Sequence, residues 1–164
     1  MERILVSSCL LGRPVRYDGA AKPVTDGLFE RWRAEGRLVP VCPEIAGGLP
    51  VPRPPAEITP PVPGHLPADD GARIMTDTGE DVTAEFLAGA RIALETARRA
   101  GARIAVLKES SPSCGSHRVY DGSFTGTRVP GMGVTTALLT SAGIRVFSED
   151  ELPEAAAYLA ELES

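Results

Sequence analysis

Three short apolar runs divide this sequence, and each leads, directly or through a short polar segment, to a cysteine. The runs cover residues 4–6, 38–41 and 104–107, and the cysteines that follow them are Cys9, Cys42 and Cys114. Apolar runs of this length, bounded by polar and turn-forming residues, are typical of buried strands. The sequence therefore predicts three strands with all of its cysteines at or just past their carboxyl ends.

Segments with helical periodicity separate these strands. The expected helices span about 25–34, 83–100 and 135–141, and a last helix runs to Leu162 after a fourth strand over 144–147. Ser148 and Glu151 have the spacing of a capping box that would begin the last helix. Short apolar strands that alternate with helices predict an α/β fold with a mostly parallel, Rossmann-like sheet and flanking helices.

The chain of 164 residues is long enough to bury one core, and we expect a single domain over 1–164. Eight prolines between positions 50 and 67 remove backbone donors and fix φ. We therefore expect 50–67 to be a surface loop that holds neither a helix nor a central strand. A β-ribbon over 72–82, turning at Asp77-Thr78-Gly79, is expected to follow it.

Net charge and hydropathy indicate which kinds of binding partner and which cellular compartment to expect. The formal net charge is −5, and no basic stripe with interleaved aromatic residues is present, so we expect a small molecule rather than a nucleic acid. The first residues enter a strand without the apolar core of a signal peptide, and no apolar run approaches the roughly 20 residues that span a bilayer. We expect a cytoplasmic protein with no membrane partner. Thiols stay reduced in that compartment, so sparse cysteines indicate a metal or catalytic role.

Three thiolates at one edge of a parallel sheet indicate a shared metal site, because ligands of open α/β sheets bind at the carboxyl ends of the strands. Their softness favours zinc, cuprous copper or an iron–sulfur cluster. Structural zinc normally has four protein ligands, and here the fourth is missing. His117 could supply it, or could be a hydrogen-bonding neighbour. With three ligands one coordination position stays open, which suits a Lewis-acid catalyst.

Several polar residues beside the cysteines are candidate site residues. Glu44, two residues after Cys42, is the carboxylate expected beside the metal, unless it is an ordinary acid in the first turn of a helix. Lys108 could anchor an anion or Glu44, or be solvated, and Glu109 is a second candidate base. Hydroxyl groups that could bind a polar substrate, or serve as ordinary turn material, are those of Ser8, Ser110, Ser111 and Ser113.

Other classes of site account for the sequence less well. A zinc nucleobase deaminase also combines cysteine ligands with a glutamate, but its Pro-Cys-x-x-Cys pair is absent here. A zinc hydrolase that uses the same three thiolates stays open as an alternative. So does a non-catalytic cluster protein, either a sulfur carrier or a redox sensor. A phosphate-binding loop is disfavoured, because the glycines at 126, 131 and 133 are not followed by Gly-Lys-Ser/Thr.

At these residues the sequence resembles a known family. The motifs that carry the resemblance are Ser8-Cys9-Leu10-Leu11-Gly12, Val15-Arg16-Tyr17-Asp18-Gly19, Val41-Cys42-Pro43-Glu44 with Gly47-Gly48-Leu49, Pro52-Arg53-Pro54 and Ser111-Pro112-Ser113-Cys114-Gly115. In this order, over nearly the whole chain, they are similar to the motifs of the bacterial thiouracil desulfidase family, long catalogued as a domain of unknown function.

The resemblance implies a cofactor and a reaction. It implies a [4Fe–4S] cluster held by Cys9, Cys42 and Cys114, with one iron free of protein ligands. It further implies non-redox removal of sulfur from a thiolated nucleobase such as 2-thiouracil, giving uracil and hydrosulfide. By motif, the catalytic glutamate of the family corresponds to Glu44 and its serine to Ser111. We therefore expect a desulfidase that acts on a thiocarbonyl carbon–sulfur bond.

Overall fold

The computed structural model describes residues 1–12, 18, 27–59 and 72–164. The motif over 15–19 therefore lies outside the described residues except for Asp18, as does part of the proline-rich segment, 60–67. No helix in the described ranges is long and apolar enough to cross a membrane. The elements in chain order are β1 (Ile4–Ser7), the 3-10 helix η1 (Ser8–Leu11), α1 (Gly27–Ala34), β2 (Leu38–Val41), α2 (Pro43–Ala46), β3 (Ala56–Thr59), β4 (Arg73–Thr76), α3 (Thr83–Ala100), β5 (Ile104–Leu107), β6 (Arg118–Tyr120), β7 (Arg128–Pro130), α4 (Val134–Ser141), β8 (Arg145–Ser148) and α5 (Leu152–Leu162).

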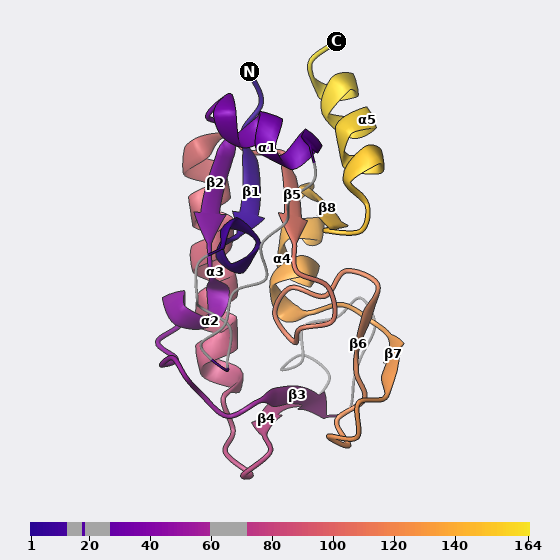
Figure 1. The fold of residues 1–164 in the computed structure, drawn as a ribbon. Coiled ribbons are helices and arrows are strands. Elements are labelled where there is room, and N and C mark those ends of the chain that lie inside the picture. The colour runs from indigo at the N-terminus through magenta and orange to yellow at the C-terminus, as the bar shows by residue number, and fades with distance from the viewer. Residues whose placement is uncertain (13–17, 19–26, 60–71) are drawn as a thin grey trace.

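A parallel sheet in the order β2-β1-β5-β8 forms the centre of the fold, which confirms the predicted α/β class. Figure 1 shows its strands side by side, with α3 and α4 on one face and α1 and α5 on the other. Both chain termini lie near the amino-end edge of the sheet. The four predicted strands of this sheet and the predicted helices over 83–100 and 135–141 agree with the observed elements to within one or two residues.

Each face of the sheet packs against a separate helical layer because side chains alternate along a strand. Ile4 and Val6 join a cluster with Phe29 of α1 and Leu159 of α5. Leu5, between them, joins the opposite cluster, which contains apolar residues of α3 and α4. All four residues of β1 are buried, as expected for a strand covered on both faces.

The carboxyl edge of the sheet is the place where a ligand site is expected. The chain adds β2 on one side of β1 and later adds β5 on the other side. The two halves of the sheet therefore diverge between β1 and β5, and such a switch point is where open α/β sheets bind ligands. Cys9 follows β1 and the loop to Cys114 follows β5, so the predicted site lies at this point.

The proline-rich segment differs from the prediction. Residues 56–59 form the strand β3, which pairs antiparallel with β4 in a two-stranded ribbon. Arg53 and Glu57 are buried, so 50–59 is not simply a surface loop. The prolines flank this strand rather than interrupt it, and a strand with a single partner tolerates neighbouring prolines. The expected ribbon within 72–82 is correspondingly reduced to one bridge between Met75 and Asp81.

The start of the last helix also differs from the prediction. Glu151 accepts the backbone N–H of Ser148 at 2.9 Å, which is one half of a capping box. The Ser148 hydroxyl instead accepts the N–H of Asp150 at 3.2 Å. The helix therefore begins at Leu152, and Ser148 remains the last residue of β8.

A close contact between two helices fixes the position of α2. A Cβ atom on Gly89, in α3, would overlap the carbonyl group of Pro43, the first residue of α2. The absence of a side chain at position 89 therefore allows α2 to approach the backbone of α3. Cys42 and Glu44 flank Pro43, so this contact holds both beside the sheet edge.

Candidate functional site

A pocket of about 410 Å³ opens at the carboxyl edge of the sheet. Its walls come from the ends of β1, β2 and β5, from the loops that follow these strands, and from β3, β6 and β7. Of the candidate site residues, His117 lies outside the pocket and the others line it: Cys9, Cys42, Cys114, Glu44, Glu109, Ser8, Lys108, Ser110, Ser111 and Ser113. The fold therefore brings these residues together from distant parts of the sequence.

The three cysteines all line the pocket and are not in disulfides. Cys9 and Cys114 are buried, and Cys42 is partly exposed. Ser7, which the sequence analysis did not select, joins two of the strand ends. Its Oγ accepts the backbone N–H of Lys108 at 3.0 Å and donates to Sγ of Cys114 at 3.7 Å. The end of β1 and the start of the loop after β5 are thus held together beside the thiols.

Burial shifts the pKa of two of the thiols. It raises the pKa of Cys114 to about 12, although hydrogen bonds from Ser113 and Ser7 act in the opposite direction. Burial also raises the pKa of Cys42. Soft metals bind thiolates, so a group bound here must displace protons from these sulfurs.

Glu44 lies in the pocket with donors on both of its carboxyl oxygens. Arg53 reaches Oε1 through Nε and Nη2, each at 3.0 Å, and also donates to the carbonyl oxygen of Pro50 at 3.1 Å. The Ser113 hydroxyl donates to Oε2 at 3.0 Å. Ser113 Oγ also lies 3.4 Å from Sγ of Cys114. One hydroxyl group therefore connects the carboxylate to a thiol.

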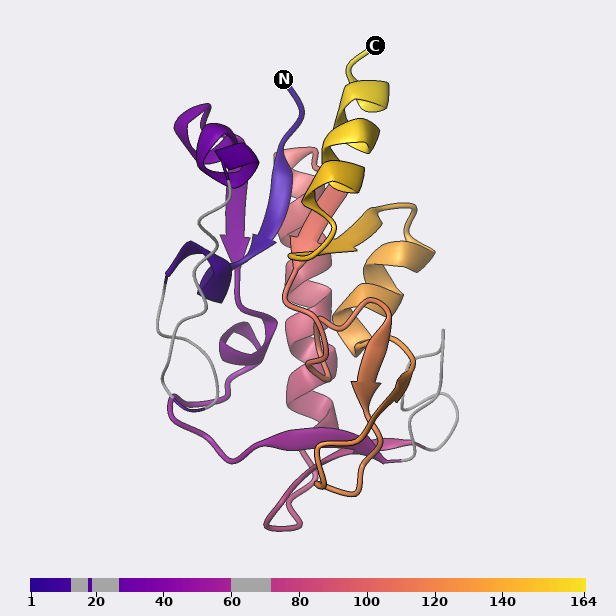
Figure 2. The ribbon, with the colours of Figure 1, turned by 45° about the vertical axis from the view of Figure 1, so that its right-hand side comes forward.

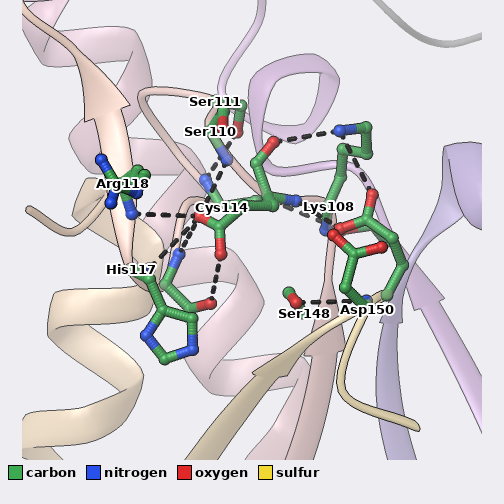
Figure 3. Close-up of polar contacts among 12 residues, drawn as sticks. Lys108, Ser110, Ser111, Cys114, His117, Arg118, Ser148 and Asp150 are labelled. Carbon is green, nitrogen blue, oxygen red and sulfur yellow. Dashed lines mark hydrogen bonds and ion pairs between the residues drawn. The ribbon is translucent and has the colours of Figure 1, made fainter. Parts of the chain in front are cut away.

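The loop that carries Cys114 is folded around the carboxyl group of Glu109. Oε1 of Glu109 accepts backbone N–H bonds from Ser110, Ser116, His117 and Arg118, at 2.9 to 3.3 Å. Oε2 accepts the Ser116 hydroxyl at 3.0 Å. Figure 3 shows Ser110, His117 and Arg118 around this carboxyl group. Glu109 is committed to the loop, which makes it a poor candidate for a base.

These contacts also set the pKa of Glu109. Burial raises it, but the backbone hydrogen bonds from Ser110, His117 and Arg118 and the bond from Ser116 lower it by more. The net pKa of Glu109 therefore lies below the ordinary value of 4.5. The ionised form is the one that the loop stabilises.

The amino end of α4 holds the same loop from the other side. Val134 and Thr135 donate their backbone N–H groups to the carbonyl oxygens of Pro112 and Ser113, both at 2.9 Å. A Cβ atom on Gly133 would lie too close to the backbone of Ser113 and Cys114, so glycine permits this approach. Backbone N–H groups in the first turn of the helix thereby donate to carbonyl oxygens of the loop, and no side chain caps the helix.

The candidate serines have different environments. Ser111 Oγ accepts the backbone N–H of Cys114 at 2.7 Å and lies 3.3 Å from Ser113 Oγ. Ser110 has a positive φ of 72°, which is unusual for a residue other than glycine and is often found at functional sites. Its hydroxyl accepts a hydrogen bond from Nη1 of Arg128 at 3.2 Å.

Lys108 and His117 have partners that the sequence left open. Lys108 could have anchored an anion or Glu44, or been solvated; in the structure its Nζ lies 3.2 Å from Glu149 and donates to the Glu109 carbonyl. The partner of Glu44 is Arg53, which comes from the proline-rich segment. His117 is exposed and its Nε2 lies 2.8 Å from Glu151. It is thus the hydrogen-bonding neighbour that the sequence analysis named as an alternative to a metal ligand.

Several lining residues were missed because they come from segments that were read as loops. Arg53 lies within one of the family motifs quoted above, which was the signal that could have identified it. Glu57 and the β6–β7 residues Tyr120 and Arg128 also line the pocket. Nothing in their local sequence marks them, because only the folding of β3 against β6 brings them together.

The donor set of the pocket fits a soft metal group, because it combines three thiols. Within the described residues, no three His, Cys, Asp or Glu side chains are arranged to hold a single metal ion. An iron–sulfur cluster makes a different geometric demand, since each thiolate binds its own iron.

Comparison with known proteins agrees with this geometry. The family model for 2-thiouracil desulfurase matches residues 4–151. An uncharacterized protein of Bacillus subtilis, YbbK, is 46% identical over 151 residues, which cover 91% of this chain and 97% of that protein. The solved structure of the [4Fe–4S]-dependent thiouracil desulfidase TudS is 51% identical, with a TM-score of 0.88 over 98% of this chain and 99% of that one. The chain described here therefore belongs to the 2-thiouracil desulfurase family.

Proposed function

We propose that this protein is a desulfidase that replaces the sulfur of a thiolated pyrimidine base with oxygen from water. For 2-thiouracil the products are uracil and hydrosulfide. No electron donor or acceptor takes part, because one water supplies the oxygen and the protons. The observation that carries the proposal is the convergence of three thiols with the hydrogen-bonded Glu44 in one pocket of a chain of this family.

The proposed cofactor is a [4Fe–4S] cluster bound by Cys9, Cys42 and Cys114. The likeness to a [4Fe–4S]-dependent desulfidase and the three cysteines that line one pocket support it. With one iron free of protein ligands, a bound cluster would supply a soft Lewis acid suited to a thiocarbonyl sulfur. The protein supplies the enclosing pocket and the groups that move protons.

Glu44 is the proposed general base that takes a proton from the attacking water. A carboxylate has about four lone-pair sites, and three donors occupy Glu44 from Arg53 and Ser113. The carboxylate is therefore held in one orientation but can still accept a proton from water. Positioned proton transfer of this kind contributes roughly 10²–10⁴-fold to the rate.

The serines divide the remaining tasks. Ser113 connects Glu44 to the Cys114 sulfur and is placed to pass a proton between the base and the sulfur side of the pocket. Ser111 holds the backbone of Cys114 and touches Ser113, so its proposed role is to orient that relay. Ser8, Lys108 and Ser110 line the pocket and are proposed to bind the substrate ring.

The proposed partner is a small thiolated base, and the proposed location is the cytoplasm. None of the three cysteines is in a disulfide, which suits a reducing compartment. A net charge of −5 disfavours binding to a nucleic-acid backbone.

The proposal is tested by incubating anaerobically prepared, cluster-loaded protein with 2-thiouracil in the absence of any oxidant or reductant. Uracil and hydrosulfide should appear in equal amounts. Addition of hydrosulfide alone should perturb the visible spectrum of the protein without a change in oxidation state, because the iron without a protein ligand has an open position for it. A fully ligated cluster has no such position, and its spectrum would not change. Stoichiometric zinc without labile sulfide would favour the hydrolase alternative. A loaded protein that converts no thiolated pyrimidine but exchanges electrons reversibly would be a redox sensor instead.

A further inference from the structure

Among the described residues, three carboxylates line the pocket, and one of them keeps an oxygen without a hydrogen-bond partner. Glu44 and Glu109 have donors on both oxygens. Glu57, on β3, accepts the backbone N–H groups of Gly122 at 2.9 Å and Phe124 at 3.2 Å, and both bonds end on Oε1. Within the described part of the chain, no hydrogen bond or ion pair reaches its Oε2.

This second oxygen is surrounded by protein and is still open to the pocket. Glu57 is only 8% exposed and is one of the lining residues. Among the described residues, the one fully enclosed side-chain oxygen or nitrogen without a partner is Oγ1 of Thr135, so Oε2 of Glu57 is not sealed. An acceptor in such a place costs free energy unless a ligand or water donates to it.

The position of β3 adds this acceptor to the pocket from a segment other than those that carry the thiols. Figures 1 and 2 both show the β3–β4 ribbon beyond the carboxyl ends of β1, β2 and β5. The thiols follow those strand ends, and Glu57 lines the same pocket from the ribbon. A ring that occupies the pocket therefore meets a lining that contains both the thiols and an unused acceptor.

We propose that Glu57 determines which thiolated ring is accepted, because its Oε2 takes a hydrogen bond from a ring N–H of the substrate. This inference rests on the function proposed above. Thiolated bases of the uracil type carry protonated ring nitrogens, which complement a carboxylate. A ring whose corresponding nitrogen is methylated cannot donate, and one with a lone pair there is repelled. Loss of one hydrogen bond to a charged acceptor corresponds to about 10- to 100-fold in binding.

A conservative substitution separates the binding of substrate by Oε2 from the structural role of Oε1, which accepts hydrogen bonds from the segment between β6 and β7. In Glu57→Gln the backbone N–H groups of Gly122 and Phe124 still require an oxygen, so the amide oxygen stays with them. The amide nitrogen then replaces Oε2 and presents a donor to the pocket. Glu57→Ala removes both interactions. Glu80→Gln, at an exposed glutamate outside the pocket, is the matched control.

The experiment compares cluster-loaded wild-type protein with these three variants. The measurements are the Kd of uracil, the kcat and KM for 2-thiouracil and its 1-methyl and 3-methyl derivatives, iron content and Tm. The wild-type protein should reject one methyl isomer by about 10- to 100-fold. In Glu57→Gln, kcat/KM for 2-thiouracil should fall by a similar factor, mainly because KM rises. The Kd of uracil should rise by a similar factor. The variant should no longer distinguish the methyl isomers, while iron content and Tm stay at the wild-type values.

Equal uracil affinity and KM in Glu57→Gln and wild-type protein would overturn the inference. A fall in Tm as large as that of Glu57→Ala would also overturn it, because the role of Glu57 would then be structural. The binding measurement distinguishes this failure from that of the proposed reaction. If loaded wild-type protein converts no thiolated pyrimidine but Glu57→Gln still weakens uracil binding, the reaction is wrong and the assignment of Glu57 stands.

Discussion

Arg53 and Glu44 form an ion pair that is largely enclosed by the protein, with two guanidinium nitrogens 3.0 Å from one carboxyl oxygen. Their side chains are 5% and 15% exposed. They lie nine positions apart in the sequence, and Arg53 comes from the proline-rich segment, in which the sequence analysis expected a surface loop. The pair determines which way the proposed base faces.

Replacing Glu44 with glutamine should separate catalysis from cluster binding. Glu44→Gln is nearly isosteric and removes the base, so kcat should fall by about 10²–10⁴-fold while iron content stays unchanged. Steady-state kinetics and iron analysis of the same preparation measure both. Loss of the iron would make Glu44 a ligand or a structural residue, and a full rate would mean that the base lies elsewhere.

Removing the charge of Arg53 should destabilise the protein, because it leaves a largely enclosed carboxylate without its positively charged partner. Arg53→Met is expected to lower the free energy of unfolding by about 3–5 kcal/mol. Arg73→Met breaks the exposed pair of Arg73 with Asp81 and should cost only about 0–1 kcal/mol. Urea unfolding of both variants gives the comparison. Equal small losses would show that the Arg53 pair contributes little to stability.

Arg53→Lys tests the orientation of Glu44 rather than the charge. Lysine keeps the positive charge but cannot contact Glu44 Oε1 through two nitrogens while also donating to the Pro50 carbonyl. We expect a lower kcat with a nearly unchanged KM for 2-thiouracil. A wild-type kcat in a variant that retains its iron would contradict a positioning role for the guanidinium group.

The fold and the placement of the thiols could be predicted because both depend on local patterns. Short apolar runs and helical periodicity fix the elements, and the parallel pairing brings the ends of β1, β2 and β5 to one edge. The partners of the charged residues could not be predicted in this way. The sequence left open whether Lys108 anchors an anion or Glu44 or is solvated, and its partner is Glu149, because side-chain pairing depends on how separate loops pack.

Single replacements of the cysteines should each abolish the cluster. After anaerobic preparation, the wild-type protein should contain iron and acid-labile sulfide in the ratio of a [4Fe–4S] cluster. Cys9→Ala, Cys42→Ala and Cys114→Ala should each lose the visible absorbance of the cluster, because two thiolates from the protein leave it under-ligated. Any variant with full iron and sulfide content would exclude that cysteine as a ligand.

Glu109 should make stability depend on pH in the acidic range. Its pKa is lowered in the folded protein, so its contribution is complete above the unfolded value near 4.5 and is lost as pH falls through the folded pKa. Glu109→Gln should therefore be less stable than wild type at neutral pH, by about 1–3 kcal/mol. The difference should shrink below pH 4.5.

Urea unfolding across this pH range measures the effect of Glu109→Gln, with Glu80→Gln as the exposed control. A difference between Glu109→Gln and wild type that does not change with pH would show that the charge of Glu109 is not what the loop stabilises.

The contact between Gly89 and Pro43 makes the reaction sensitive to a position that no substrate reaches. Because α2 packs directly against the backbone of α3, the distance between these two helices affects how far Glu44 lies from the cysteine sulfurs. Alanine is normally favoured over glycine inside a helix, yet at position 89 one extra methyl group would push α2 away. Gly89→Ala would thus keep every thiol and carboxyl group of the pocket and still reduce the activity, because one added carbon atom changes the spacing between α2 and α3.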